Sequence, residues 1–180
     1  MSVPVLASTR VWRFDELDEL PDNGCQYEVV DGHLVVTPPP TDLHVLVAHR
    51  LRRALEVGMP DGWELFIDAP VRFGADGRIA DVAAVRLDRV PTLAEPTVIA
   101  PDQFGLIVEI VSPRTRKTDR FTKPGEYAEA GVPIYWRVEL DPEARLHAFV
   151  LRDGAYAEVD GPAPTPWGEH VIDWEALGIS

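Results

Sequence analysis

The sequence predicts an α/β protein, a mixed sandwich of helices and strands, and three observations lead to this fold class. Short β-like runs outnumber helical ones along the chain. The run Phe104–Val111 is almost unbroken in apolar residues, as in a central strand that is covered on both faces. An amphipathic helix before this run and a second helix after it can supply the covers.

Turn and cap residues bound the predicted elements. Asp31-Gly32 joins two short β runs and is typical of a type I′ hairpin turn. Apolar side chains recur about every 3.6 residues over 42–57, which predicts a helix that is closed by Gly58. The second helix is expected to end at Gly131. Residues 11–20 should be helical, residues 89–101 a surface loop, and the strands lie at 27–30, 33–37, 63–67, 69–73, 79–87, 104–111, 134–140, 146–151 and 156–159.

The composition is that of an ordinary globular chain and excludes several classes of protein. The chain has 180 residues, which fits a single domain over 1–180. It carries 17 basic and 30 acidic residues, a net charge of −13, which argues against nonspecific coating of nucleic acid but leaves room for a local basic groove. Cys25 is the only cysteine, so an intramolecular disulfide is impossible. Without a run of about 18 apolar residues, no membrane partner is expected, and the chain is predicted to be soluble and cytoplasmic.

Two carboxylates stand at positions where charge is costly. Glu109 interrupts the most apolar strand, and Asp81 opens an otherwise apolar strand before it. Because neighbouring strands lie about 4.8 Å apart, carboxylates at adjacent strand ends can share one divalent cation. The alternative is structural: Asp81 caps a strand and Glu109 pairs with an arginine.

A basic segment follows Glu109 in this acidic chain. Five basic residues lie in the ten residues Arg114–Lys123, and on a regular helix Arg116, Arg120, Lys123 and Tyr127 would share one face. The ordinary interpretation is a solvated basic face that offsets nearby acids. Its place directly after the Glu109 strand favours a groove that faces phosphate, where cations and a metal could support phosphodiester hydrolysis.

Several motifs together resemble the Uma-two family of proposed restriction endonucleases, within the PD-(D/E)XK nuclease superfamily. The resemblance runs in order through most of the chain, and its specific part lies between Glu109 and Trp136. The matching segments are 27–34, 38–40, His44, 79–82, 108–113, Thr115-Arg116, Asp119-Arg120, Lys123, Tyr127 and 131–136.

The resemblance implies a restriction-endonuclease-like mixed β-sheet flanked by helices, with its core at about residues 14–160. It also implies a metal-dependent endonuclease that uses Mg²⁺ or Mn²⁺ to hydrolyse nucleic acid, with DNA as the expected substrate. Asp81 and Glu109 would be the metal ligands, Glu28 would complete or support them, and Lys123 would be the catalytic lysine. His44 matches a family histidine and is a candidate accessory residue. The nucleic-acid-binding candidates in the basic segment are Arg114, Arg116, Lys117 and Arg120.

Two departures from the superfamily pattern bear on activity. Val111 stands where a lysine usually follows the second acid. The resemblance to the family implies that a lysine on the following helix takes this role, and Lys123 matches that place. Pro124 comes directly after it, and the helix must either begin at Pro124 or kink there. The alternative function is therefore a catalytically inactive nuclease-fold protein that serves as a binding or assembly module.

A homodimer is also expected from the sequence. The strand at 134–136 and those after it place apolar and aromatic residues on a predicted outer strand. An uncovered strand edge needs protection, and a second copy of the chain is a common way to provide it. A helix or the segment around Trp167 and Trp174 could cover the same edge instead.

Overall fold

The computed structural model describes residues 10–86 and 99–179. The predicted loop at 89–101 lies largely outside these residues. In chain order the elements are η1 Phe14–Glu19, β1 Gln26–Val30, β2 His33–Thr37, α1 Asp42–Leu55, β3 Trp63–Phe73, β4 Asp76–Arg86, η3 Pro101–Gln103, β5 Phe104–Ile110, η4 Thr118–Thr122, α2 Lys123–Glu129, β6 Ile134–Glu139, β7 Arg145–Arg152, β8 Ala155–Val159, β9 Ala163–Thr165 and β10 Gly168–His170. Among the described residues, no helix is long and apolar enough to cross a membrane.

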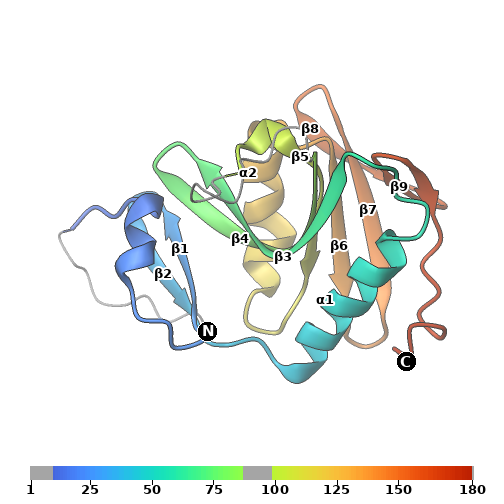
Figure 1. Ribbon diagram of the computed structural model, residues 1–180, viewed down its shortest axis with the longest axis horizontal. Coiled ribbons are helices and arrows are strands. Elements are labelled where there is room, and N and C mark those ends of the chain that lie inside the picture. The colour runs from blue at the N-terminus through green and yellow to red at the C-terminus, as the bar shows by residue number, and fades with distance from the viewer. Residues whose placement is uncertain (1–9, 87–98, 180) are drawn as a thin grey trace.

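A mixed sheet of eight strands forms the centre of the fold (Figure 1). Its order is β2-β1-β4-β5-β6-β7-β8, and β3 pairs with β4 outside this path. Strands β5 and β6 are parallel, whereas the other pairs are antiparallel. The predicted central strand is confirmed, because all seven residues of β5 are buried.

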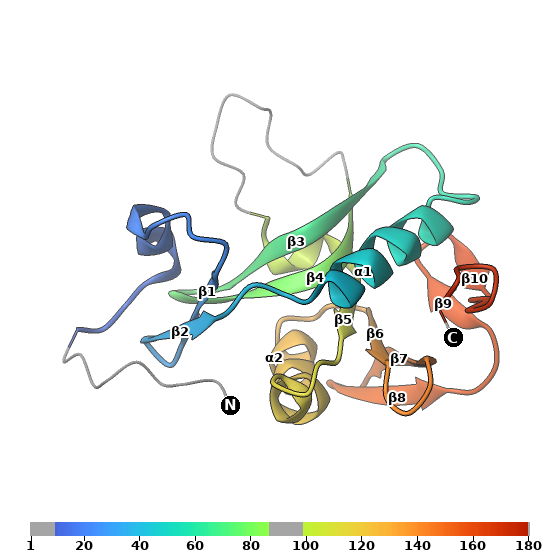
Figure 2. The ribbon, with the colours of Figure 1, turned by 90° about the horizontal axis from the view of Figure 1, so that it is seen from below.

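The helices cover opposite faces of this sheet (Figure 2). Helix α1 buries Val47, Leu51 and Leu55 in a cluster that includes Trp136 and Ile179. On the other face, Tyr127 of α2 packs in a second cluster around side chains of β3, β4, β5 and β6. The mixed α/β sheet flanked by helices is therefore confirmed.

Local turn and cap chemistry behaves as the sequence predicts. Asp31 and Gly32 have φ values of 50° and 70°, the left-handed values that a type I′ turn requires, and they join β1 to β2. Thr41 is the N-cap of α1, where its hydroxyl accepts a hydrogen bond from the His44 amide. Gly131 ends α2 with φ at 80°.

Three sequence expectations are corrected by the structure. Segment 14–19 forms a 3₁₀ helix, and β3 is one strand that continues through Asp68 at a φ of 52°. The predicted outer strand β6 is interior, because it pairs with β5 on one side and β7 on the other. Its Tyr135 and Trp136 are fully buried, so the argument for a homodimer from an uncovered β6 no longer holds.

Candidate active site

The candidate site lies where one edge of β4 lacks a strand partner. Strand β3 pairs with β4 along almost its whole length, so β1 and β5 must share the other edge. The β1 pairing involves Gly77, whereas the β5 pairing begins at Val82. Residues 78–81 therefore fall in the gap between two neighbouring strands.

Site side chains supply the hydrogen bonds that a strand would have made in this gap. The carboxylate of Glu28 accepts from the Ile79 amide at 3.0 Å, and the Lys123 ammonium donates to the Ile79 carbonyl at 3.3 Å. Across the gap, Asp81 accepts from the Ile110 amide at 2.6 Å. Because buried backbone polar groups need partners, the gap draws these side chains to one place.

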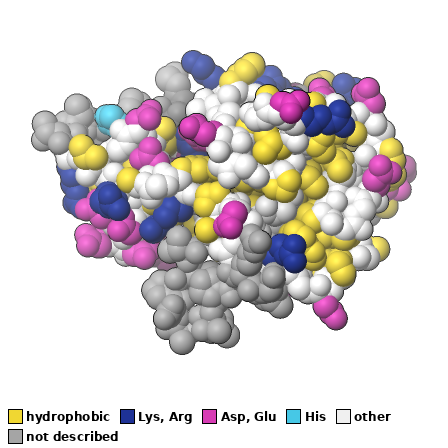
Figure 3. Space-filling view, turned by 90° about the horizontal axis from the view of Figure 1, so that it is seen from above, with side chains coloured by type: hydrophobic (Ala, Val, Ile, Leu, Met, Phe, Trp, Pro, Cys, Tyr) yellow, Lys and Arg dark blue, Asp and Glu magenta, His cyan; other side chains and the backbone are white. Residues whose placement is uncertain are grey.

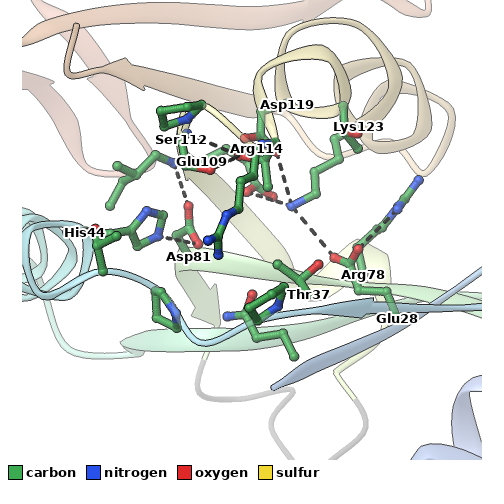
Figure 4. Close-up of a pocket in the computed structure, with 18 of the residues that line it drawn as sticks. Glu28, Thr37, His44, Arg78, Asp81, Glu109, Ser112, Arg114, Asp119 and Lys123 are labelled. Atoms are coloured by element: carbon green, nitrogen blue, oxygen red, sulfur yellow. Dashed lines mark hydrogen bonds and ion pairs between the residues drawn. The ribbon is translucent and has the colours of Figure 1, made fainter. Parts of the chain in front are cut away.

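A cavity of about 240 Å³ opens over this gap (Figure 4). Its floor contains Asp81 and Glu109, and one wall is formed by β1, β2 and the segment 38–41. The opposite wall is formed by Ser112–Thr115 together with residues of η4 and α2. The structure thus brings six of the predicted site residues to one cavity: Glu28, His44, Asp81, Glu109, Arg114 and Lys123.

Both carboxylate oxygens of Asp81 are engaged, and the residue is only 7% exposed. One oxygen accepts from the Ile110 amide, and the other lies 3.0 Å from Nε2 of His44 in the first turn of α1. Burial opposes the charged imidazole, but the hydrogen bond to Asp81 and its negative charge outweigh burial and raise the pKa of His44. His44 therefore holds the Asp81 carboxylate from the helix side.

Glu109 is held between a lysine and a tyrosine at the centre of the site. It is 1% exposed, and its two oxygens accept from Lys123 at 2.8 Å and from the Tyr127 hydroxyl at 2.5 Å. Burial raises the pKa of Glu109 well above its usual range, although the positive charge of Lys123 acts against this rise. Burial and the negative charge of Glu109 together raise the pKa of Tyr127 well above its usual range. The Tyr127 hydroxyl is therefore a stable hydrogen-bond donor.

Lys123 is a buried cation shared by several acids. Besides Glu109, its ammonium lies 3.5 Å from an Asp119 oxygen and 3.8 Å from a Glu28 oxygen. Burial would lower the pKa of this ammonium, but the charges of Glu109, Glu28 and Asp119 raise it well above its usual range. Lys123 is therefore a permanent hydrogen-bond donor rather than a proton acceptor.

Three residues of the site, Arg78, Asp119 and Tyr127, were not predicted to be functional from the sequence. Arg78 is 4% exposed and links Glu28 at 3.2 Å to Glu126 at 2.7 Å. Asp119 is 1% exposed, and burial raises the pKa of its carboxyl in spite of the neighbouring Lys123. The four-residue spacing from 119 to 123 and 127 is the sequence signal that could have found two of them.

The helical segment after β5 differs from the predicted regular helix. Thr118–Thr122 is a π-helical turn, and the Lys123 amide bonds to the carbonyl of Thr118, five residues earlier. This wider turn directs Asp119, Lys123 and Tyr127 toward the site. The expectation that Arg116 and Arg120 share their face is wrong.

The basic segment does not form one positive patch beside the carboxylates. Arg120 forms a bidentate pair with Glu139, with both bonds at 2.8 Å, and Arg116 pairs with Asp141 at 3.1 Å. Neither lines the cavity, and neither does the exposed Lys117. Arg114 alone of the four predicted nucleic-acid-binding residues lies on the cavity wall. Figure 3 shows the molecule from above the view of Figure 1, away from the loop after β5, and basic and acidic side chains are intermingled on that face too.

The donor chemistry of the cavity suits a hard divalent cation. Four carboxylates and two buried cations meet there: Glu28, Asp81, Glu109, Asp119, Arg78 and Lys123. Within the described ranges, no three His, Cys, Asp or Glu side chains are grouped closely enough to hold a metal ion by themselves. Mg²⁺ is usually bound by one or two carboxylates with water and substrate phosphate completing its shell, so Asp81, Glu109 and the Ile110 carbonyl could contribute to such a site.

Comparisons with known proteins identify the family and the fold of this chain. The model of the Uma2 family, described as "Putative restriction endonuclease", matches residues 14–175. The fold is similar to that of a crystal structure of "a putative nuclease belonging to DUF820" from Anabaena variabilis, with a TM-score of 0.68 and 18% identity over 86% of this chain and 89% of that one. A comparison with curated proteins finds no match. Since the family model covers most of the sequence, this chain belongs to the Uma2 family of nucleases.

Proposed function

We propose that the protein is a metal-dependent endonuclease that hydrolyses phosphodiester bonds in nucleic acid, with DNA as the expected substrate. The observation that carries the proposal is the meeting of Asp81, Glu109 and Lys123 at the gap in the β4 edge. An acidic pair on adjacent strands beside a buried lysine is the arrangement that the PD-(D/E)XK resemblance implies. Membership of the Uma2 family supports the same reaction class.

Asp81 and Glu109 would hold Mg²⁺ or Mn²⁺, with Glu28 supporting the site through Lys123 and Arg78. Such an ion activates a water molecule and neutralises charge on the phosphate. The excess of carboxylates over buried cations supports this role. Burial raises the pKa values of Glu109 and Asp119, and the negative charge of Asp81 adds to this effect, so a divalent ion beside these groups would favour their charged forms.

Lys123 would act as a charged hydrogen-bond donor. Its raised pKa keeps the ammonium protonated at neutral pH, so it can orient a water molecule or stabilise a phosphate oxygen but is not the base. Tyr127 and His44 would fix the two carboxylates, since each contacts one oxygen of Glu109 or Asp81. Both are positioning residues in this mechanism.

Cleavage of circular DNA tests the proposal. Circular single-stranded and circular duplex DNA have no ends, so their conversion to linear products in Mg²⁺ or Mn²⁺ identifies an endonuclease. Asp81→Asn should lose cleavage and should also lose the Mn²⁺ binding that isothermal titration measures, because the substituted amide lacks the negative charge. Lys117→Ala, at an exposed lysine outside the cavity, should not change Mn²⁺ binding.

The alternative is a nuclease-fold binding module. One observation favours it: all four oxygens of Asp81 and Glu109 already contact protein donors. If the purified wild type converts no circular or linear nucleic acid with either metal and binds no Mn²⁺, the binding module replaces the enzyme.

A further inference from the structure

The cations that line the cavity differ in their availability to a ligand. Arg78 and Lys123 are buried, and both are engaged by carboxylates. Arg114 is exposed, lines the same cavity and forms no ion pair within the described part of the chain. In Figure 4 its side chain extends into the cavity toward Asp81. Arg114 is therefore the cation that can bind an incoming phosphate without first breaking an ion pair.

Within the described part of the chain, Lys117 is the one other cation of the basic segment that forms no ion pair. Arg116 and Arg120 are paired with Asp141 and Glu139, and the whole chain carries a net charge of −13. A protein that binds duplex DNA through about 6–10 phosphate contacts needs a basic group at each of them. The charges of this surface are suited to holding very few phosphates at once.

The depth of the candidate catalytic groups also restricts the substrate. Asp81 and Glu109 are 7% and 1% exposed, on the floor between the prolines of segment 38–40 and the loop Ser112–Thr115. A phosphodiester must enter between these walls to reach them. Duplex DNA is stiff over about 150 base pairs, whereas the backbone of an unpaired strand can turn a single phosphate inward. The exposed prolines offer apolar contact to the unstacked nucleosides of such a strand.

We propose that the site acts on unpaired nucleic acid strands, DNA or RNA, and that Arg114 binds a phosphate of the strand at the cavity wall. The inference rests on the proposed nuclease function and narrows its substrate class. Overhangs, flaps and single strands would be substrates, and continuous duplex would not.

Cleavage of matched substrates tests the substrate class. One labelled DNA strand is assayed alone, annealed as a blunt duplex and annealed with a single-stranded overhang, beside an RNA strand of the same sequence. We expect the unpaired DNA or RNA strand to be cleaved at least about tenfold faster than the blunt duplex, and cleavage of the overhang substrate to stop at the junction. Equal rates on the blunt duplex and the single strand would overturn the inference and leave the nuclease function intact. No cleavage of any substrate with Mg²⁺ or Mn²⁺ would overturn the nuclease function itself.

Binding measurements test the role of Arg114. The affinity of the wild type for the single strand, measured by fluorescence anisotropy in EDTA, should fall with salt at a log–log slope that is about 0.7 steeper than for Arg114→Ala, because a single-strand phosphate contact contributes roughly that amount. Arg53→Ala is the matched control: Arg53 is exposed, forms no ion pair within the described residues and lies about 13.5 Å along α1 from His44. Equal affinity and slope for wild type and Arg114→Ala would overturn this assignment.

Discussion

Replacing Lys123 by methionine tests the buried charge cluster directly. The ammonium lies 2.8 Å from Glu109 and 3.5 Å from Asp119, and the residue is 6% exposed. Methionine keeps much of the buried stem but removes the charge. Breaking a buried ion pair by removal of one partner lowers stability by about 3–5 kcal/mol, because the other charge is left uncompensated. We expect Lys123→Met to lose about this much free energy of unfolding near neutral pH.

The loss of stability should become smaller in acid. Burial already raises the pKa of Glu109, and Lys123 is the largest influence against that rise. A carboxyl whose folded pKa is raised binds its proton more tightly in the folded state. The loss of unfolding free energy that this group causes is complete above its folded pKa. It disappears as the pH falls below the unfolded-state pKa of about 4.3. The difference in unfolding free energy between Lys123→Met and wild type should therefore narrow as the pH falls through the raised folded pKa of Glu109.

Urea unfolding followed by circular dichroism, in EDTA, measures both effects. Lys117→Met is the matched control, because this lysine is exposed and forms no ion pair within the described residues, and it should stay within about 0.5 kcal/mol of wild type. The double variant Lys123→Met/Glu109→Gln removes both charges and should recover most of the loss. Equal stability of Lys123→Met and wild type near neutral pH would refute the buried ion pair.

Three further predictions concern other contacts. His44→Gln should weaken Mn²⁺ binding by about 10- to 100-fold in isothermal titration, because Asp81 loses a partner that orients it; unchanged binding contradicts this role. Tyr127→Phe leaves one oxygen of a buried carboxylate without its donor and should lower the free energy of unfolding by about 1–3 kcal/mol, which chemical denaturation measures against wild type. Gly105→Ala should lower the melting temperature, since an indole and a proline ring occupy the space of the added methyl group; an unchanged melting temperature shows that these rings move aside freely.

Sequence patterns located the elements and the acids of the site because those features are local. The Asp31-Gly32 turn, helix α1 and the buried β5 each follow from residue types within a few positions. The proximity of Asp81 and Glu109 followed from placing their strands next to one another, and β4 and β5 do pair. The predicted direction of the side chains after β5 was wrong. The prediction assumed a regular helix of 3.6 residues per turn, whereas the chain forms a π turn there.

Long-range pairing explains the remaining omissions. Arg78 reads as an ordinary residue of a strand, and only the fold places it between Glu28 and Glu126. The sequence of the basic segment predicts a positive groove, because the acidic residues that pair with its arginines come later in the chain. Arg120 and Glu139 are 19 residues apart in sequence, and no local pattern relates them.

Pro124 shows how the structure accommodates a residue that reads as disruptive in the sequence. Pro124 lies in the first turn of α2, directly after the π turn. In a π turn each amide donates to the carbonyl five residues earlier, so an amide at position 124 would have donated to the Asp119 carbonyl, but proline has no amide hydrogen. That carbonyl instead accepts a hydrogen bond from the Tyr135 hydroxyl at 2.8 Å, so the lost bond is replaced by one from β6. The proline thus separates the π turn from the α-helix without leaving a buried carbonyl unpaired. Lys123, at this junction, reaches Glu109 because of the change in helical pitch, and Pro124 is no argument against catalysis.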